Sequence, residues 1–387
     1  MIQDFQREST QKRDVTTLEF KKKFEASVAR YRAEVVQTIR EKRPLCLPMF
    51  SANGDDLLVR AACWEVLVQL CEDEGLDAQD IQVTAVLSED LESMHESAIG
   101  IYSKGTASGV LDKHAVDNAT LYQESLYEFS AALGVRLEPS VYEKSPKIWP
   151  TDKGPLKNVD ADKINEHMVR IREMTKGRPL VVIGQAGSMA EKRFSDTQLA
   201  EVAATARNKR QGAFIVVVSD KHFLRTDLPK MLAKEKPAQF PIAGQPNTKY
   251  TPEQIEHFTQ ELNTTLVPHQ ENEIDYVAEI TDINELLAYF RLAAEADMTD
   301  GYWMHLAASQ DVPNLIALFT LFQAKKWASP ETTVVSGDVV AKQQGEYIPT
   351  QWYHFMNNDG HAPVPTADNY GIERNDIQKF TQAVSGT

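Results

Sequence analysis

The sequence predicts an α/β protein in which two Rossmann-like domains face each other across an interdomain cleft. Three observations lead to this fold class. Short apolar runs typical of buried strands alternate with helical stretches, as a parallel sheet covered by helices requires. The alternation starts again after a proline-rich stretch at 139–160. The chain has 387 residues, which suits two domains of about 100–200 residues each.

The first part of the chain supplies a long helix and one strand–helix–strand series. Residues 16–40 carry apolar side chains at helical spacing, which predicts an amphipathic helix docked on a domain. LCLPMF (45–50) and IQVTAVL (81–87) predict buried strands, with a helix at 55–75 between them. Two further helical patterns lie at 91–104 and 119–133.

After a helix at 161–176, the second part repeats the alternation. RPLVVIGQ (178–185) and GAFIVVVS (212–219) predict apolar strands around a helix at 197–210. DINELLAYFRLAAEAD (282–297) predicts an amphipathic helix capped by Asp282. The remaining expectations are strands at 266–269, 276–280 and 315–319, a helix after MTDGYW, a last helix near 372–384, and loops over a cleft at 220–263 and 340–370.

These elements predict four regions. They are an N-terminal helical extension (1–43), an N-terminal Rossmann-like domain (44–150), a C-terminal Rossmann-like domain (151–345) and a C-terminal tail with a helix (346–387).

Composition narrows the possible functions. The 41 Lys and Arg residues against 56 Asp and Glu residues give a net charge of −15, which disfavours non-specific binding of nucleic acid. Cys46, Cys63 and Cys71 stand in apolar surroundings and are expected to be buried free thiols in a reducing compartment. The sequence shows no CxxC or HExxH metal motif, no secretory signal and no membrane-spanning run. We therefore expect a soluble cytoplasmic protein without a metal site.

The first segment that suggests chemistry is SANGDDLLVR (51–60). Gly54 permits a tight turn after a strand, and Asp55 and Asp56 follow where a helix begins. A carboxylate there is a good structural cap, because it faces unpaired backbone N–H groups and the positive end of the helix dipole. The same position also suits a general base that projects into a cleft. The segment alone does not separate the two readings.

The second segment, GQAGSMAEKRFSD (184–196), follows a buried strand. Its small residues, Gly187 and Ser188 among them, leave backbone N–H groups accessible, and Lys192 adds a nearby cation. Backbone amides with a fixed cation are a way to hold a diphosphate. The segment matches neither the Walker A pattern nor GxGxxG, and a solvated loop explains it equally well.

The third segment is TDGYWMHLAASQDVPNLIALF (299–319). A strand end delivers Asp300, Gly301 supplies backbone freedom, and His305 stands at the opening of a helix with small residues after it. This arrangement suits a second phosphate or ribose contact. A hydrogen-bonded structural role for His305 is the alternative.

Taken together, the three segments resemble the ADP-heptose:lipopolysaccharide heptosyltransferases of glycosyltransferase family 9, which have the GT-B fold. The matching stretches are SANGDDLLVRAACWEVL, VVIGQAGSMAEKRFSDTQLAEVA and EITDINELLAYFRLAAEADMTDGYWMHLAASQDVPNLIALF. The match is good over 178–219 and 276–320 and thin over 44–88.

The resemblance implies an inverting, metal-independent glycosyltransferase with an acceptor domain followed by a donor domain. The donor would be a nucleotide-diphosphate sugar linked to ADP, UDP or GDP, and no cofactor is implied. Asp55 would deprotonate the acceptor hydroxyl. The donor-binding residues would be Gly187, Ser188, Lys192, Asp300, Gly301 and His305. The acceptor stays open: a saccharide, a protein, a lipid-linked glycan or a nucleobase.

One departure from the family pattern affects these expectations. Gly301-Tyr302-Trp303 stands where the family has Thr-Gly-Pro, so a hydroxyl is lost and two bulky aromatic residues replace small ones. A different sugar, a stacking contact with a base, or loss of activity would each fit this change. The alternatives are therefore a catalytically silent GT-B-like binding or assembly module, and a nucleotide-sugar 2-epimerase.

Overall fold

The computed structural model describes most of the chain and divides it into two compact units. The described residues are 2–48, 54–86, 94–111, 119–146, 159–185, 194, 196–220, 273–320, 324–337, 372 and 374–386. The N-terminal unit comprises Met1–Lys157 with Lys325–Pro330, and the C-terminal unit comprises Asn158–Ala324 with Glu331–Thr387.

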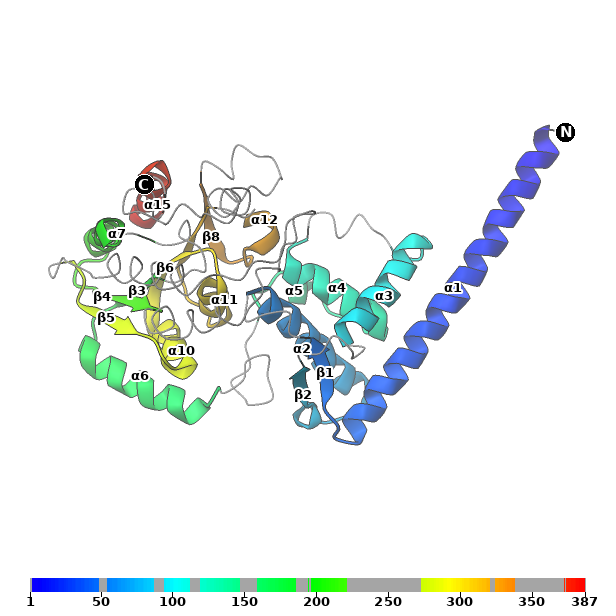
Figure 1. Ribbon diagram of the computed structural model, residues 1–387, viewed down its shortest axis with the longest axis horizontal. Coiled ribbons are helices and arrows are strands. Elements are labelled where there is room, and N and C mark those ends of the chain that lie inside the picture. Colours follow the sequence, from blue (N-terminus) through cyan, green and yellow to red (C-terminus); the bar gives the residue numbers. More distant parts are fainter. Residues whose placement is uncertain are drawn as a thin grey trace, which may run out of the picture. The chain divides into compact units, whose positions relative to one another are not determined.

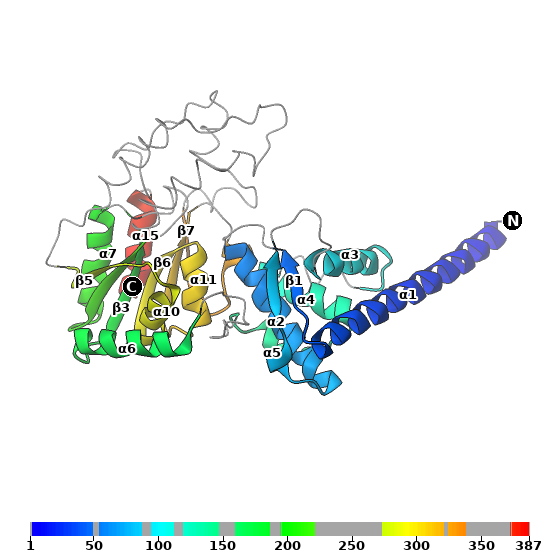
Figure 2. The same cartoon turned by 60° about the horizontal axis from the view of Figure 1, so that its bottom comes forward.

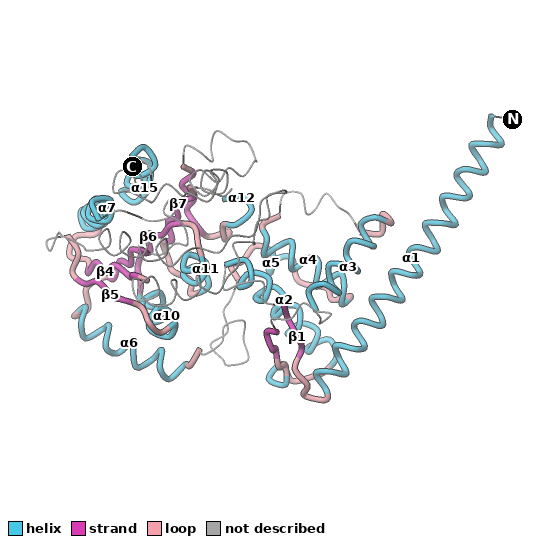
Figure 3. Tube along the Cα trace, in the orientation of Figure 1, coloured by secondary structure: helices cyan, strands magenta, loops and turns pink. Residues whose placement is uncertain are grey.

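The N-terminal unit is built around a strand–helix–strand motif. Strands β1 (Leu45–Pro48) and β2 (Val83–Val86) pair in parallel, with Leu45 opposite Val83, and are drawn in magenta in Figure 3. Helix α2 (Gly54–Glu74) and the short 3-10 helix η1 (Ala78–Asp80) connect them. The other helices are α3 (Met94–Ala107), α4 (Leu121–Leu133) and α5 (Pro139–Tyr142). Helix α4 is bounded by a capping box between Thr120 and Gln123 and by Gly134 in the left-handed conformation.

The N-terminal helix α1 (Ile2–Arg40) docks on this unit through its second half. Phe24, Val28, Tyr31, Val35 and Ile39 recur at helical spacing and join the core formed by α2, α3 and α4. The Tyr31 hydroxyl donates a hydrogen bond of 2.7 Å to the Met94 carbonyl, which ties α1 to the start of α3. The expected helix at 16–40 is therefore confirmed, and it begins earlier, at Ile2.

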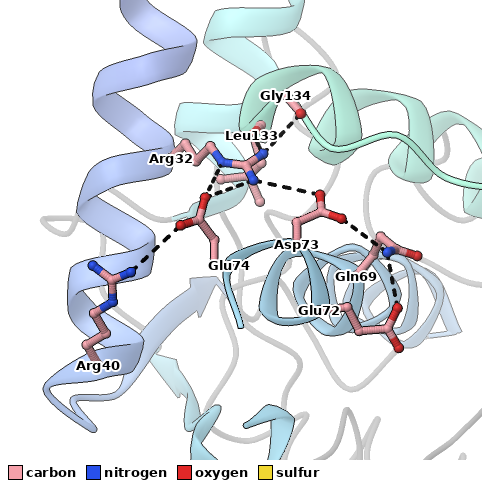
Figure 4. Close-up of polar contacts among 8 residues, drawn as sticks. All are labelled: Arg32, Arg40, Gln69, Glu72, Asp73, Glu74, Leu133 and Gly134. Atoms are coloured by element: carbon pink, nitrogen blue, oxygen red, sulfur yellow. Dashed lines mark hydrogen bonds and ion pairs between the residues drawn. The ribbon is translucent and has the colours of Figure 1, made fainter. Parts of the chain in front are cut away.

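Arg32 joins three helices of this unit (Figure 4). Its guanidinium donates to Glu74 at the end of α2 at 2.9 Å, and to the carbonyls of Leu133 and Gly134 at 3.1 and 3.0 Å. The last carbonyls of a helix have no partner within the helix. Arg32 therefore caps the end of α4 and anchors α1 at the same time.

The C-terminal unit contains a six-stranded parallel sheet in the order β5-β4-β3-β6-β7-β8. This is the strand order of a Rossmann fold, and it confirms the α/β class. The strands are β3 (Leu180–Gln185), β4 (Phe214–Ser219), β5 (Tyr276–Glu279), β6 (Ala293–Thr299), β7 (Leu315–Phe319) and β8 (Thr332–Ser336).

Helices cover both faces of this sheet (Figures 1 and 2). On one face, α7 (Asp196–Lys209) and α15 (Arg374–Ser385) pack on each other and form an apolar core with the strands. On the other face, α6 (Ala161–Thr175) packs against α10 (Ile283–Leu292), and α11 (Tyr302–Ser309) lies beside α10. The short α12 (Ala324–Trp327) ends at Trp327, a residue of the N-terminal unit that packs on the core of that unit.

At the amino edge of the sheet, Asp275 ties the starts of three strands together. Its carboxylate accepts hydrogen bonds from the Ile215 amide at 2.9 Å and from Arg207 at 2.8 Å, and Arg178 lies 2.6 Å away. The Arg178 guanidinium also lies over the Phe214 ring. Burial opposes ionisation of Asp275, but the bonds from Ile215, Arg178 and Arg207 outweigh it and lower its pKa below the ordinary value of 3.8.

One sequence prediction is wrong in part. The helix expected over 282–297 ends at Leu292, and the chain continues at once as strand β6. Ala-Ala-Glu-Ala-Asp favours a helix locally, yet here the segment pairs with β3 and β7 in the middle of the sheet, where burial and strand pairing override local propensity. Asp282 does cap α10, as predicted, by accepting a bond from the Asn284 amide.

The other expected elements were found where the structure describes them, and β8 was not anticipated. The strand expected at 266–269 and the loops expected at 220–263 and 340–370 lie outside the described residues. The cysteines are free thiols; Cys63 and Cys71 are buried as expected, but Cys46 is only partly buried. Burial raises the pKa of Cys71 to about 11, so this thiol stays protonated. Among the described helices, none has the length and apolarity needed to cross a bilayer.

The Arg32 contacts generate a prediction. Replacing Arg32 with Met keeps the aliphatic stem but removes the bonds to the end of α4 and leaves Glu74, among the described residues, with only Arg40, at 3.7 Å. We expect the free energy of unfolding of the N-terminal unit to fall by about 1–3 kcal/mol, since hydrogen bonds to charged groups are worth about that much. Urea denaturation, with hydrogen exchange of α1 amides as the local readout, measures this loss.

Arg30→Met is the matched control. Arg30 lies on the same helix, is 80% exposed and reaches Glu34 only at 4.0 Å, so its loss should leave stability unchanged. Equal effects of the two substitutions would show that Arg32 does not anchor α1.

Candidate functional site

The strand order of the C-terminal unit contains one reversal, between β3 and β6. Strand β3 pairs in parallel with β4 on one side and with β6 on the other. The chain runs outward from β3 through β4 to β5, and outward from β6 through β7 to β8. The connections that leave the carboxyl ends of β3 and β6 therefore diverge. In open α/β sheets this topological switch point is where ligands bind.

Two of the three segments singled out in the sequence begin at this point. The segment 184–196 continues from the end of β3, and Asp300 follows the end of β6. The two strands are direct neighbours, with Ile183 opposite Asp297. Strand pairing thus brings the starts of two segments that lie more than a hundred residues apart in the sequence to adjacent positions on one sheet edge.

On the β3 side, the described residues bracket the predicted diphosphate-binding turn. Gly187, Ser188 and Lys192 themselves lie outside the described residues. Phe194, just beyond them, is fully buried, and its ring packs on Phe380 of α15 with the centroids 5.4 Å apart. Core packing therefore holds strand β3 before this segment and Phe194 after it.

Gly184, the next-to-last residue of β3, is needed for packing. A Cβ atom at this position would lie 2.4 Å from Cε and 2.6 Å from Sδ of Met298 in β6. The Met298 side chain is itself 2% exposed, so it has little room to move. The absence of a side chain at Gly184 thus allows β3 and β6 to pack closely immediately below the switch point.

On the β6 side, Asp300 and His305 are held together by the turn into α11. Each is 3% exposed, and the Asp300 amide donates to the Leu318 carbonyl of β7 at 2.9 Å. The His305 amide donates to the Gly301 carbonyl at 3.3 Å, in the first turn of the helix. The structure thus places Asp300, Gly301 and His305 within one strand-to-helix turn.

Gly301 does not supply the backbone freedom expected of it. Its φ of 163° and ψ of −176° are extended values that any residue can adopt. A Cβ atom at Gly301 would meet none of the described atoms within 4 Å, so that side of the backbone is open. Gly301 is the N-cap residue of α11 and makes no side-chain cap, and the positive end of the helix dipole lies at this position.

The aromatic departure from the family pattern lies in the same turn. Tyr302 and Trp303 are the first two residues of α11, and both are partly buried. They stand at the edge where a bound group would approach the switch point. The structure gives them no position deep in the core, in contrast to Met304, which is 1% exposed.

Sequence reasoning missed two polar residues on this edge. Ser219 ends β4 and is fully buried, and Thr320 follows β7 and is 5% exposed. The Thr320 hydroxyl has no hydrogen-bond partner within the described part of the chain. The available signal was a hydroxyl residue directly after an apolar strand, in FIVVVS and in LIALFT.

Asp55 belongs to the N-terminal unit. It is the second residue of α2, so the expected position at a helix start is correct, and its side chain is outside those that the structure describes. Among the described residues, no group of three or more His, Cys, Asp or Glu side chains is arranged to hold a metal ion.

The contact between Gly184 and Met298 generates a prediction. Gly184→Ala should lower the free energy of unfolding of the C-terminal unit by about 1–3 kcal/mol, the usual effect of overfilling a packed core. In a Met298→Ala background the space is vacated, so the same substitution should cost nothing further. A double-mutant cycle in urea measures this coupling.

Gly100→Ala in α3 is the control, because a Cβ there meets no described atom within 4 Å and alanine favours a helix. A Gly184→Ala protein as stable as the wild type, or equally destabilised in both backgrounds, would contradict the packing role.

Comparison with known proteins gives likenesses in structure. No protein-family model matches the sequence, and no curated protein matches it. A glycosyl transferase of family 9 from Veillonella parvula has a TM-score of 0.44 and 11% identity, over 88% of this chain and 97% of that chain. The ADP-heptose lipopolysaccharide heptosyltransferase II of E. coli has a TM-score of 0.41 and 11% identity, over 88% and 98%. An α,α-trehalose-phosphate synthase from Burkholderia xenovorans has a TM-score of 0.25 and 9% identity, over 94% and 74%. The first two are the kinds of protein that the sequence motifs resemble.

Proposed function

We propose that this chain is a glycosyltransferase of the GT-B type that uses a nucleotide-diphosphate sugar. The C-terminal unit binds the donor, and the N-terminal unit binds the acceptor across an interdomain cleft. The reaction inverts the anomeric centre, needs no metal ion, and uses Asp55 as the base that takes the proton of the acceptor hydroxyl. The acceptor is left open.

One observation carries the donor site: the segments 184–196 and 300–305 both start at the switch point of a sheet with Rossmann strand order. Sequence patterns selected these segments independently of the strand order. In open α/β sheets the switch point is the position where ligands bind, which supports a donor site formed by these two segments.

The chemistry of a diphosphate leaving group fits the groups at this edge. The N-terminus of α11 presents the positive end of a helix dipole, which favours an anion. Lys192 supplies a cation in the turn after β3, and Ser188 supplies a hydroxyl. Together they would offset the charge that develops on the diphosphate as the sugar departs, which is the role a metal ion has in other transferases.

A second candidate is a silent binding or assembly module, and Tyr302 with Trp303 favours it. Two bulky side chains in the first turn of α11 stand where small residues suit a diphosphate in the resembled family. A module of this kind would bind no donor at all. Donor binding therefore separates the two candidates before any turnover is measured.

The first experiment is a thermal-shift panel with ADP-, UDP- and GDP-linked sugars. A ligand at about 100 times its Kd adds about 2.7 kcal/mol to the stability of the folded state, so one nucleotide series should raise Tm clearly. Free sugars without the nucleotide serve as controls. If every nucleotide sugar leaves Tm unchanged at millimolar concentration, the donor site does not exist and the silent module is the better account.

The second experiment compares Asp55→Asn with Asp56→Asn. Asp55 and Asp56 both lie in the first turn of α2, so each change removes a similar helix-dipole interaction of about 0.3–1 kcal/mol and should leave the helix folded. If Asp55 is the base, Asp55→Asn should lower kcat by about 10²–10⁴ with donor affinity unchanged, whereas Asp56→Asn should stay near the wild type. Equal activities would reduce Asp55 to a structural cap.

The third experiment tests the cation. Lys192→Ala should weaken donor binding roughly 10- to 150-fold, because a hydrogen bond to a charged group contributes about 1.5–3 kcal/mol. Arg193→Ala, at the neighbouring position, is the control. Calorimetry that finds an unchanged Kd for Lys192→Ala would remove this residue from the diphosphate site.

A further inference from the structure

Strand β6 carries two carboxylates in the interior of the C-terminal unit. Glu295 and Asp297 are both 0% exposed. Side chains two residues apart on a strand point to the same face. Glu295 stands opposite Val181, and Asp297 stands between Ile183 of β3 and Ile316 of β7. These three neighbours belong to the core under α7 and α15, so both acids face that core.

The two acids differ in their partners. Glu295 Oε2 accepts bonds from Lys209 Nζ at 3.0 Å and from Arg210 Nε at 2.9 Å, at the end of α7. Neither carboxyl oxygen of Asp297 has a hydrogen-bond partner in the described residues. A buried charge without a partner is strongly disfavoured, and a buried acid in this situation holds its proton instead.

The charges around Asp297 do not reverse this conclusion. Beneath α7, the groups that act on Asp297 are Lys209 and Arg210, both already bonded to Glu295. Helix α15 packs through Ile377, Phe380 and Val384, while its buried acid, Asp376, lies beside Gly337 after β8, where an added Cβ atom would be 2.6 Å from Oδ2. Burial, and then the negative charge of Glu295, raise the pKa of Asp297 well above its ordinary value of 3.8, and the two cations lower it by less.

We propose that Asp297 is a protonation switch. The folded C-terminal unit holds it as a neutral acid, and the loss of its proton loosens α7 and α15 from the sheet. The neutral form needs one proton and no other reactant. Because β6 leads directly to Asp300, and α7 is the helix that follows the turn after β3, the switch lies immediately beneath the sheet edge described above.

The raised pKa of Asp297 in the folded protein fixes the direction in which pH changes stability. Below pH 3.8 both the folded and the unfolded chain carry the proton, and Asp297 costs nothing. As the pH rises, the unfolded chain releases the proton while the folded chain keeps it, so unfolding becomes about tenfold more favourable per pH unit from this group. The cost stops growing at the pKa of the folded protein, above which Asp297 is ionised in place.

Infrared difference spectroscopy of the full chain tests the neutral state directly. The wild type at neutral pH should show the C=O stretch of a protonated carboxyl group, and Asp297→Asn should lack that band. Asp275→Asn is the matched control: its carboxylate is in the same unit but is ionised by its arginine partners, so this change should leave the band intact. A spectrum in which wild type and Asp297→Asn are identical would overturn the proposal.

Hydrogen exchange, expressed as protection factors between pH 6 and 9, tests the loosening. Amides of α7 and α15 should lose protection as the pH rises, while those of α2 and α4 in the other unit stay constant. Asp297→Asn should abolish the pH dependence. A parallel decline in the variant, or an equal decline in both units, would contradict the switch.

If Asp297→Asn does not fold, the infrared and hydrogen-exchange data of the wild type alone still test the proposal. The protection of α15 should fall with rising pH while the protonated-carboxyl band persists, and it should stop falling at the pH where the band disappears. A band that is absent from the start, or that disappears before α15 begins to lose protection, would refute the link.

Discussion

The reversal of strand order between β3 and β6 is the constraint on which the rest of the C-terminal unit depends. Because all six strands are parallel, every strand ends at the same edge, and the two central connections must leave in opposite directions. Close pairing at this point requires that Gly184 carry no side chain, since Met298 fills its place. Pairing of β3 with β6 thus places the end of β3 beside the end of β6, and the proposed chemistry depends on that neighbourhood.

Local sequence patterns were sufficient to predict many of the strands and helices. FIVVVS, apolar except for its last residue, and the wholly apolar LIALF are short runs, and both became fully buried strands. β6 was misread because Ala-Ala-Glu-Ala-Asp favours a helix locally, and only pairing with β3 and β7 makes it a strand. β8 escaped notice because it is an edge strand whose middle residues are exposed, so it lacks the apolar signal of the interior strands.

Some residues of the candidate site could also be predicted from the sequence, and others could not. Asp300 and His305 could be picked out from the turn-to-helix pattern, and the structure holds them in one turn. Thr320 and Ser219 could not, because a hydroxyl after a strand gains meaning only from the strand order, which is a long-range property. Gly301 shows the opposite error: its extended backbone suits any residue, so a glycine in the sequence indicated flexibility where the fold requires none. Asp297 was hidden inside the misread helix, where an acid is unremarkable.

The central claim is that the edge formed by β3 and β6 holds the diphosphate of a nucleotide sugar. Hydrogen-exchange mapping with a nucleotide sugar that raises Tm tests this most directly. The account predicts slower exchange for amides at 299–306 and after Gln185, with no change at the amino edge around Asp275. Protection confined to another surface, or no protection at 299–306 under saturating ligand, would contradict it.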